Sequence, residues 1–368
     1  MLLQPSHFKL ARICRDITKP VKSIDRKRTG TAKVPQPLLR RLVRWVIASA
    51  MALAPGLHPA GAQPLRQEPC STPSAPSVAI TFDDLPYSIA GDPEARNALH
   101  AAREANSSIL AALDRYHAPA TGFVVERRVK ALGQMGETLL APWNRGHLEL
   151  GNHSFGHKDS NDLSVEEFRR EVMEGEATIG PMVRNVGRSL SFFRFPYNHV
   201  GDTADRREAF EAVLRERGYR IAASTIDTSD YLFDAAHEHA LKTGDEDMRH
   251  RIETAYLDYS RAEIAYYADL NRRVLGCDVP AIMLLHLNRI NASVMDRLLG
   301  IFQRSGYRFV SLDEAQAHPA YASSPRFATR FGPMWGYRWA RDRGIKVDGN
   351  REQEPPAWIV SYGKSPAP

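Results

Sequence analysis

The sequence predicts an α/β fold in which strands and helices alternate around a parallel sheet or barrel. A short apolar run at 77–82 has the composition of a buried strand and follows a segment rich in proline and serine. Two later helical segments end alike, at Gly218 and Gly306, where a glycine suited to a left-handed cap precedes Tyr-Arg and a new strand. Repeated helix-to-strand connections of this kind are typical of parallel sheets and barrels.

The other elements follow from periodicity and capping. Residues 92–116 carry an apolar stripe at helical spacing, and Ser164 with Glu167 forms an S-x-x-E capping box that opens a further helix. The further predicted strands cover 120–125, 147–150, 190–193, 219–225, 280–285 and 307–310. The further predicted helices cover 137–145, 203–217, 245–275 (with room for one break) and 292–304.

Four segments are expected along the chain. Residues 1–62 are interpreted as a signal peptide with a long or misassigned N-terminal extension, and 63–76 as a linker. Residues 77–320 form the main domain. Residues 321–368, which contain several prolines and three tryptophans, are interpreted as an extension packed on that domain.

The first segment also explains the basic character of the chain. The net charge is +6, but residues 1–62 hold twelve Lys and Arg against two acidic residues, so the remainder carries a net charge of −4. The body of the protein therefore gives no support for nucleic-acid binding. Arginines precede the apolar stretch 45–54, and Ala60-Gly61-Ala62 resembles a cleavage site, which together indicate a secretory signal.

We expect a secreted or periplasmic protein, cleaved after Ala62, with no stable membrane span after cleavage. The apolar stretch is shorter than the ~20 residues that a span needs. An uncleaved N-terminal anchor is the alternative. Of the three cysteines, Cys70 and Cys277 could pair in an oxidising compartment, and the absence of a C-x-x-C pair argues against a thiolate zinc site.

Two adjacent carboxylates, Asp83 and Asp84, follow the first predicted strand. Side chains that point apart along a strand can converge in a turn, where one carboxylate can bind a cation while the other acts as a base. The alternative is a simple turn or helix cap before Pro86.

Two histidines, His153 and His157, follow the predicted strand 147–150. At a spacing of four they would share one face of a helical turn and could bind one metal. With Asp84 they form a set of one carboxylate and two imidazoles, which suits a divalent metal such as zinc and leaves room for water and substrate. A metal there would activate water, and Asp83 would take the proton.

Five further candidates each follow a predicted strand. Arg194 could hold a carboxylate in a bidentate pair, and the backbone N–H of Tyr197 could face an oxyanion. Asp227 or Asp230 is a plausible partner for Arg194. His286 could be a general acid whose pKa is tuned by a buried carboxylate. Taken singly, each of these residues also suits a purely structural role.

In order, the sequences TFDD at 81–84, HSFGH at 153–157, RFPY at 194–197, DTSDY at 227–231 and LLH at 284–286 form one set. This set resembles the five motifs of the polysaccharide deacetylase family, the NodB-homology domain of carbohydrate esterase family 4. The resemblance covers roughly residues 76–320. Asp-Tyr stands where the fourth motif usually has Asp-Trp, Asn-His follows the third motif where many members have glycine, and the stretch 232–279 is long.

The resemblance implies a distorted (β/α) barrel of seven or eight strands over residues 77–320. It also implies a metal, usually zinc, held by Asp84, His153 and His157. For the remaining residues the resemblance implies that Asp83 is the catalytic base and His286 the catalytic acid. Arg194 would orient Asp83, and the backbone of Tyr197 would contact the oxyanion. Asp227 or Asp230 would tether Arg194 or the catalytic acid.

The sequence therefore predicts a metal-dependent hydrolase that removes N- or O-acetyl groups from a polysaccharide or oligosaccharide. A catalytically silent carbohydrate-binding barrel is one alternative, although every candidate catalytic position is filled. An Fe(II) oxygenase is another, since two histidines and a carboxylate also suit that metal. Such sites are common in β-rich barrels, whereas this chain alternates strands and helices.

Overall fold

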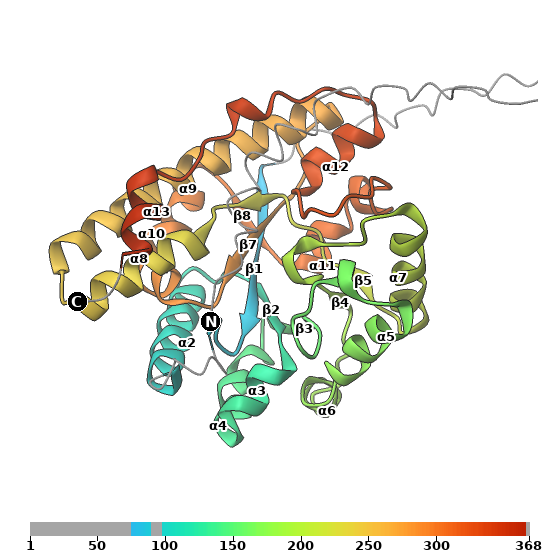
Figure 1. Cartoon of the computed structure of the whole chain (residues 1–368), viewed down its shortest axis with the longest axis horizontal. Helices are drawn as coiled ribbons and strands as arrows, with labels where there is room; N and C mark the ends of the chain where they lie inside the picture. Colours follow the sequence, from blue (N-terminus) through green and yellow to red (C-terminus); the bar gives the residue numbers. More distant parts are fainter. Residues whose placement is uncertain (1–74, 90–97, 366–368) are drawn as a thin grey trace, which may run out of the picture. The chain divides into compact units, whose positions relative to one another are not determined.

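The computed structural model of this chain describes residues 75–89 and 98–365. In this part of the chain, eight strands form one parallel sheet in the order β5-β4-β3-β2-β1-β7-β6, and β8 pairs with β1 (Figure 1). The strands are β1 (Ser77–Leu85), β2 (Ala120–Val124), β3 (Leu148–Asn152), β4 (Phe192–Phe193), β5 (Arg220–Ile221), β6 (Ile226–Asp227), β7 (Ala281–His286) and β8 (Arg308–Val310). The predicted α/β class and distorted barrel are confirmed.

Helices connect most successive strands of the parallel sheet, whereas β5 and β6 follow each other without a helix. The described helices are α2 (Ala98–Arg115), α3 (Glu126–Leu132), α4 (Gln134–Leu140), α5 (Val165–Glu174), α6 (Ile179–Asn185), α7 (Ala204–Glu216), α8 (Asp230–Thr243), α9 (Glu246–Leu275), α10 (Arg289–Arg304), α11 (Leu312–Gln316), α12 (Trp335–Asp342) and α13 (Ala357–Gly363). The predicted capping box is present, because the Ser164 hydroxyl accepts from the Glu167 N–H and the Glu167 carboxylate accepts from the Ser164 N–H.

Strand β1 lies at the centre of the sheet and is buried along almost its whole length. Apolar side chains of α2, β7 and α10 pack around it in the main core. A smaller core lies beside β4, where Phe168, Phe193 and Phe210 pack ring against ring. These two cores fix the carboxyl ends of β1, β3, β4 and β7, which carry the candidate residues.

The region after β5 differs from the prediction. The expected strand 219–225 is broken: β5 ends at Ile221, and β6 occupies only Ile226 and Asp227. Helix α8, which the sequence did not predict, starts three residues after the end of β6, after Ser229 in a left-handed conformation (φ 48°). The following helix α9 runs for 30 residues without the break that was allowed for it.

The C-terminal helices lie against α8 and α9. Helix α13 packs on α8 and α12 packs on α9 (Figure 1). Trp335 and Trp339 of α12 meet the ring of Tyr321 at centroid distances of 5.8 and 5.3 Å, and all three side chains are buried. Aromatic burial of this kind holds the segment to the described body. The domain limits given above remain predictions.

The predicted signal peptide, the linker up to residue 74, Cys14 and Cys70 lie outside the described residues. Cys277, which is described, is disulfide-bonded. Among the described helices, none combines the length and apolar composition needed to cross a membrane.

Candidate active site

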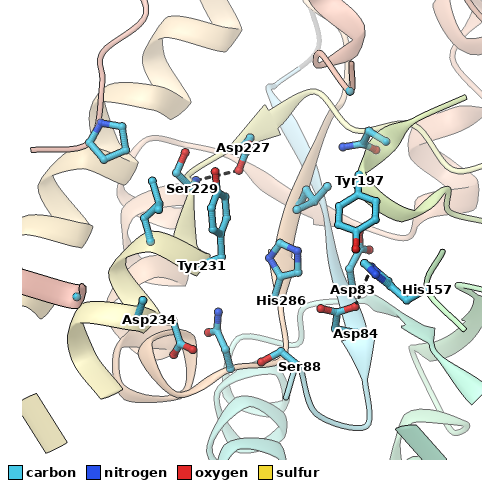
Figure 2. Close-up of a pocket in the computed structure, with 18 of the residues that line it drawn as sticks. Asp83, Asp84, Ser88, His157, Tyr197, Asp227, Ser229, Tyr231, Asp234 and His286 are labelled. Atoms are coloured by element: carbon cyan, nitrogen blue, oxygen red, sulfur yellow. Dashed lines mark hydrogen bonds and ion pairs between the residues drawn. The ribbon is translucent and has the colours of Figure 1, made fainter. Parts of the chain in front are cut away.

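Seven of the nine candidate residues line a cavity of about 1940 Å³ at the carboxyl ends of the strands, and the other two, Arg194 and Asp230, are buried behind them. Figure 2 shows Asp83, Asp84, His157 and Tyr197 on one side of His286, and Asp227, Ser229 and Tyr231 on the other. This is the end of a parallel β/α structure where functional groups collect. The prediction that these strand ends converge is therefore matched by the structure.

A bulge at the end of β1 brings the two adjacent carboxylates to the same site. The pairing of β1 with β2 shifts register between Phe82 and Leu85. Within the shift, Asp84 adopts a left-handed conformation with φ 73°. A bulge redirects a side chain out of the alternating pattern of a strand, so Asp83 and Asp84 both reach the cavity while remaining 4% and 7% exposed.

The two histidines do not share a helical turn, and this part of the prediction is wrong. Ser154 and His157 have positive φ angles of 71° and 55°, which interrupt any helix. The Asn152 side chain accepts from the Ser154 N–H at 2.8 Å, and the Glu171 carboxylate accepts from the Gly156 N–H at 2.6 Å. The loop built in this way still brings the two rings to a centroid distance of 4.9 Å.

A hydrogen bond orients the first histidine. Nδ1 of His153 lies 2.8 Å from the backbone carbonyl of Arg194, so Nδ1 carries the proton and donates it. Nε2 is left facing the carboxylates, at 3.8 Å from Asp84 Oδ1. Nε2 of His157 lies 3.3 Å from the same oxygen. A backbone partner behind a ligand histidine is the usual way that such a ring is fixed.

These three residues fit a metal ion. One ligand atom from each of Asp84, His153 and His157 lies within 4.8 Å of the others, and all three side chains are largely buried. Burial lowers the pKa of His157 to about 3 and lowers that of His153, so both imidazoles are neutral and can offer lone pairs. Burial opposes ionisation of Asp84, but Arg128 and the nearby histidines hold its pKa well below the usual range.

Arg128 is a site residue that the sequence analysis missed. Its Nη1 lies 2.5 Å from Asp84 Oδ1, and both side chains are largely buried. Arg128 lies in α3, four residues beyond the end of β2. The other candidates were identified as polar residues shortly after a strand, and Arg128 also meets this criterion. However, Arg128 does not belong to a recognisable motif, and nothing in the sequence favoured it over its neighbour Arg127.

Arg194 contacts the predicted base through one nitrogen only. Nη1 of Arg194 lies 3.4 Å from Asp83 Oδ1, whereas Nη2 donates to Thr81 Oγ1 and to the Ala223 carbonyl at 3.2 and 3.0 Å. The bidentate pair expected from sequence is therefore absent, because the second nitrogen is used by β1 and the segment after β5. The guanidinium is fully buried and lies 4.7 Å from the ring centroid of Phe123.

Of the two aspartates left open as tethers, Asp230 pairs with His286. The Asp230 carboxylate accepts from Nδ1 of His286 and from its backbone N–H, both at 2.7 Å. Burial lowers the pKa of His286, but Asp230 and, more weakly, Asp84 and Asp83 raise it to about 10 overall. His286 is therefore a cation near neutral pH, with Nε2 carrying a proton.

Asp227 and Tyr197 take different positions. The Asp227 carboxylate accepts from the Ser229 N–H at 2.8 Å and lies across His286 from the carboxylate pair (Figure 2). Tyr197 has a left-handed backbone (φ 59°), and its half-exposed ring lies 4.7 Å from that of His157. Its ring thus borders the cavity, and the oxyanion contact of its backbone N–H remains a prediction.

Comparisons with known proteins agree with the motifs. Residues 71–222 match the family model described as polysaccharide deacetylase. None of the curated proteins matches the chain. The match ends before the fourth and fifth motifs, so Asp230 and His286 rest on the geometry described above.

Solved structures with similar folds include three from bacteria. One is a CE4 family pseudoenzyme from Bacillus anthracis, 17% identical over 66% of each chain with a TM-score of 0.43. Another is the peptidoglycan deacetylase PdaC from Bacillus subtilis, 20% identical over 67% of this chain and 94% of that chain, with a TM-score of 0.40. A third is a family 4 carbohydrate esterase from Streptomyces lividans in complex with acetate, 16% identical over 66% of this chain and 97% of that chain, with a TM-score of 0.41.

The family match confirms the resemblance that the motifs carry. Residues 71–222, which include the first three motifs, are therefore similar to the polysaccharide deacetylases.

Proposed function

We propose that this protein removes N- or O-acetyl groups from a polysaccharide or oligosaccharide with the help of a divalent metal, zinc being the first candidate. The observation that carries the proposal is the set of Asp84, His153 and His157 beside a second carboxylate, Asp83, and a protonated histidine, His286. A metal held by those three ligands would polarise the acetyl carbonyl and acidify the attacking water.

Asp83 is placed to act as the base. Its Oδ2 lies 3.8 Å from Nε2 of His153, so it borders the ligand set without being needed in it. Arg194 holds its other oxygen. In this arrangement Asp83 accepts the proton of the attacking water, and Arg194 keeps the carboxylate in position, a role that does not require it to touch the substrate.

His286 is placed to act as the acid. Cleavage of an acetamide breaks a carbon–nitrogen bond, and the leaving nitrogen needs a proton in order to depart as an amine. His286 can supply it from Nε2, because Asp230 occupies Nδ1 and stabilises the imidazolium. The products are acetate and the free amine, or acetate and an alcohol in the case of an ester.

The test is acetate release from a panel of N- and O-acetylated glycans, with and without a chelator. The His153→Ala variant should lose both bound metal and activity on whichever glycan the wild type accepts. His250→Ala, an exposed residue of α9, serves as the matched control and should change neither. Activity of the His153→Ala variant equal to that of the wild type, or full activity of metal-free protein, would refute the proposal.

We also infer that the protein acts outside the cytoplasm. The inference rests on the sequence alone, on the arginines before the apolar stretch 45–54 and on the small residues ending at Ala62. N-terminal sequencing of the protein recovered from the producing cell's exterior would test it, with Gln63 as the expected first residue.

A further inference from the structure

The backbone at the end of the third motif is left-handed at two consecutive residues, which form the Tyr197–Asn198 turn. Tyr197 has a φ of 59° and Asn198 a φ of 55°. Residues other than glycine adopt this conformation rarely, because Cβ then crowds the backbone carbonyl. Such a conformation persists where the surrounding structure holds it in place. The contacts around these two residues therefore show what fixes the turn.

A segment from the C-terminal part of the chain, residues 327–338, lies against this turn. A Cβ atom on Gly332 would lie 1.9 Å from the carbonyl oxygen of Tyr197 and 2.9 Å from Cβ of Asn198. Gly332 is not among the glycines with a left-handed φ, so the position requires the lack of a side chain and not conformational freedom. Any larger residue would have to displace the segment or the Tyr197 carbonyl.

Arg338 of α12 binds the same turn through a second contact. Its Nη2 donates to the Asn198 carbonyl at 2.8 Å, and its Nε donates to the Pro333 carbonyl at 3.0 Å. Two further hydrogen bonds of 3.3 Å reach the carbonyls of Phe327 and Phe331. One guanidinium thus joins the turn to the segment that packs on it.

The burial of Arg338 indicates a role that an apolar side chain could not fill. The residue is 2% exposed, and burial lowers its pKa to about 10, so it remains a cation near neutral pH. The four acceptors described above are neutral carbonyls, and their hydrogen bonds offset the cost of burying this charge. A planar guanidinium with five N–H groups can serve four acceptors, whereas a lysine ammonium has only three N–H groups.

Further hydrogen bonds attach the turn and the segment to neighbouring loops. Oδ1 of Asn198 accepts from the Ser224 hydroxyl at 3.1 Å, and the Ser224 carbonyl accepts from the Trp335 N–H at 2.9 Å. The Asn161 side chain donates to the Arg330 carbonyl at 3.0 Å. Segment 327–338 therefore contacts the chain after each of three successive strands, β3, β4 and β5.

We propose that Arg338 and Gly332 are positioning residues, which hold the Tyr197–Asn198 turn so that the Tyr197 backbone N–H is aimed at the oxyanion. The proposal rests on the proposed function and on the predicted oxyanion contact of that N–H. A donor fixed in advance stabilises the transition state more than the bound substrate, because negative charge develops on the acetyl oxygen only as water attacks. Residues outside the first three motifs then complete the reaction centre.

The kinetic test uses Gly332→Ala and Arg338→Met on a glycan that the wild type deacetylates. Each should lower kcat about tenfold or more and leave KM and bound zinc close to those of the wild type, because a misplaced oxyanion donor weakens the transition state alone. Arg338→Lys should recover part of kcat, since an ammonium can still donate to the Asn198 carbonyl. Gly332 also lines the cavity, so a rise in KM with an unchanged kcat would show that the segment only shapes the cleft, and would overturn the proposal.

Gly336→Ala and Arg341→Met are the matched controls. A Cβ atom on Gly336 would lie 2.3 Å from Oδ1 of Asn271 in α9, so this substitution crowds α12 closely without meeting the third motif. Arg341 is an exposed arginine of the same helix, and its guanidinium lies 5.1 Å from the ring centroid of Phe327. Neither control should change kcat, and thermal unfolding of every variant checks that it folds. An equal loss of kcat in the controls would overturn the proposal.

A readout without catalysis separates this proposal from the proposed function. In protein labelled with ¹⁵N-tyrosine, the Tyr197 amide resonance is assigned by its absence from a Tyr197→Phe variant. It should shift in Gly332→Ala and Arg338→Met and stay in place in both controls. An unmoved resonance, or a shifted one with an unchanged kcat, would overturn the proposal and leave the hydrolase. A shifted resonance in a protein that releases no acetate from any glycan would remove the proposed reaction, and with it the oxyanion role, while the contact itself would stand.

Discussion

The two sides of His286 are built from different kinds of sequence. The metal side comes from short motifs at the carboxyl ends of β1, β3 and β4, and its residues could be named before the structure was known. The other side is lined by one face of the long helix α9 and by the C-terminal segment around Glu352, which Tyr267 contacts across 85 residues of the chain. Local patterns therefore specify the residues of the candidate metal site, whereas tertiary packing specifies the opposite wall of the cavity.

The largest effect expected on the metal side is that of Asp83→Asn. Loss of the base should lower the rate of acetate release by about 10²–10⁴-fold. Metal content should remain, since Asp83 borders the ligand set without belonging to it. Asp84→Asn is the companion variant and should lose metal and activity together. If both variants lost metal equally, the division of work between the two carboxylates would be wrong.

A smaller effect is expected from Asp230→Asn, about a hundredfold in rate, through the pKa of His286. That pKa is raised to about 10, so wild-type His286 remains protonated near neutral pH and activity should fall as pH rises through about 10. The Asn variant loses the strongest raising influence, and its alkaline limb should move to lower pH. The measurement is the pH–rate profile. An unmoved limb would show that His286 is not the acid.

The raised pKa of His286 also determines how the stability of the fold depends on pH. A histidine whose pKa is higher in the folded state than in the unfolded chain stabilises the fold when protonated in both states. The contribution is fully present below the ordinary pKa of 6.5 and is lost as pH rises through about 10. Loss of stability and loss of activity above pH 10 must therefore be separated by measuring both.

Arg128→Gln should raise the affinity of the site for the metal roughly tenfold, whereas the preceding substitutions lower activity. Arg128 places a positive charge 2.5 Å from Asp84 Oδ1, the oxygen that the metal needs. Removing this charge should tighten binding of zinc to the metal-free protein, as measured by calorimetry. Arg127→Gln, its neighbour in α3, is the control and should leave the affinity unchanged. Weaker binding in Arg128→Gln would mean that the arginine supports the ligands.

Particular residues show how much of the candidate site could be predicted from the sequence. Asp83, Asp84, His153 and His157 were found because each lies close to the end of a predicted strand and in a short pattern with a chemical meaning. The way in which they meet was not found, because a bulge at Asp84 and a left-handed residue at His157 depend on neighbouring strands and on Glu171. The parallel sheet could be predicted from alternation, whereas helix α8, which follows the broken strand 219–225, was missed.

Glu263 shows the same limit on the other side of His286. On α9 it is one acidic residue among several, and its helical spacing from Tyr259 and Tyr267 is ordinary. Its raised pKa depends in part on the charges of Glu352 and Asp227, which lie near it because the C-terminal segment and β6 pack there. From the sequence alone, Glu263 would be interpreted as an exposed surface charge.

The smallest effect expected is on stability, and it tests whether ionisation of the buried Glu263 carboxyl destabilises the fold. The pKa of Glu263 is raised to about 9, so the folded protein binds a proton there that the unfolded chain releases near pH 4.5. Stability must then fall as pH rises from about 4.5 to 9, because folding carries an uptake of that proton.

Glu263→Gln removes this loss, and its melting temperature should exceed that of the wild type by a few degrees near pH 9 and less at pH 5. Asp258→Asn, which removes one negative charge from the exposed face of the same helix, should follow the wild type at both pH values. A difference that did not depend on pH would mean that the pKa of Glu263 is not raised in the folded protein.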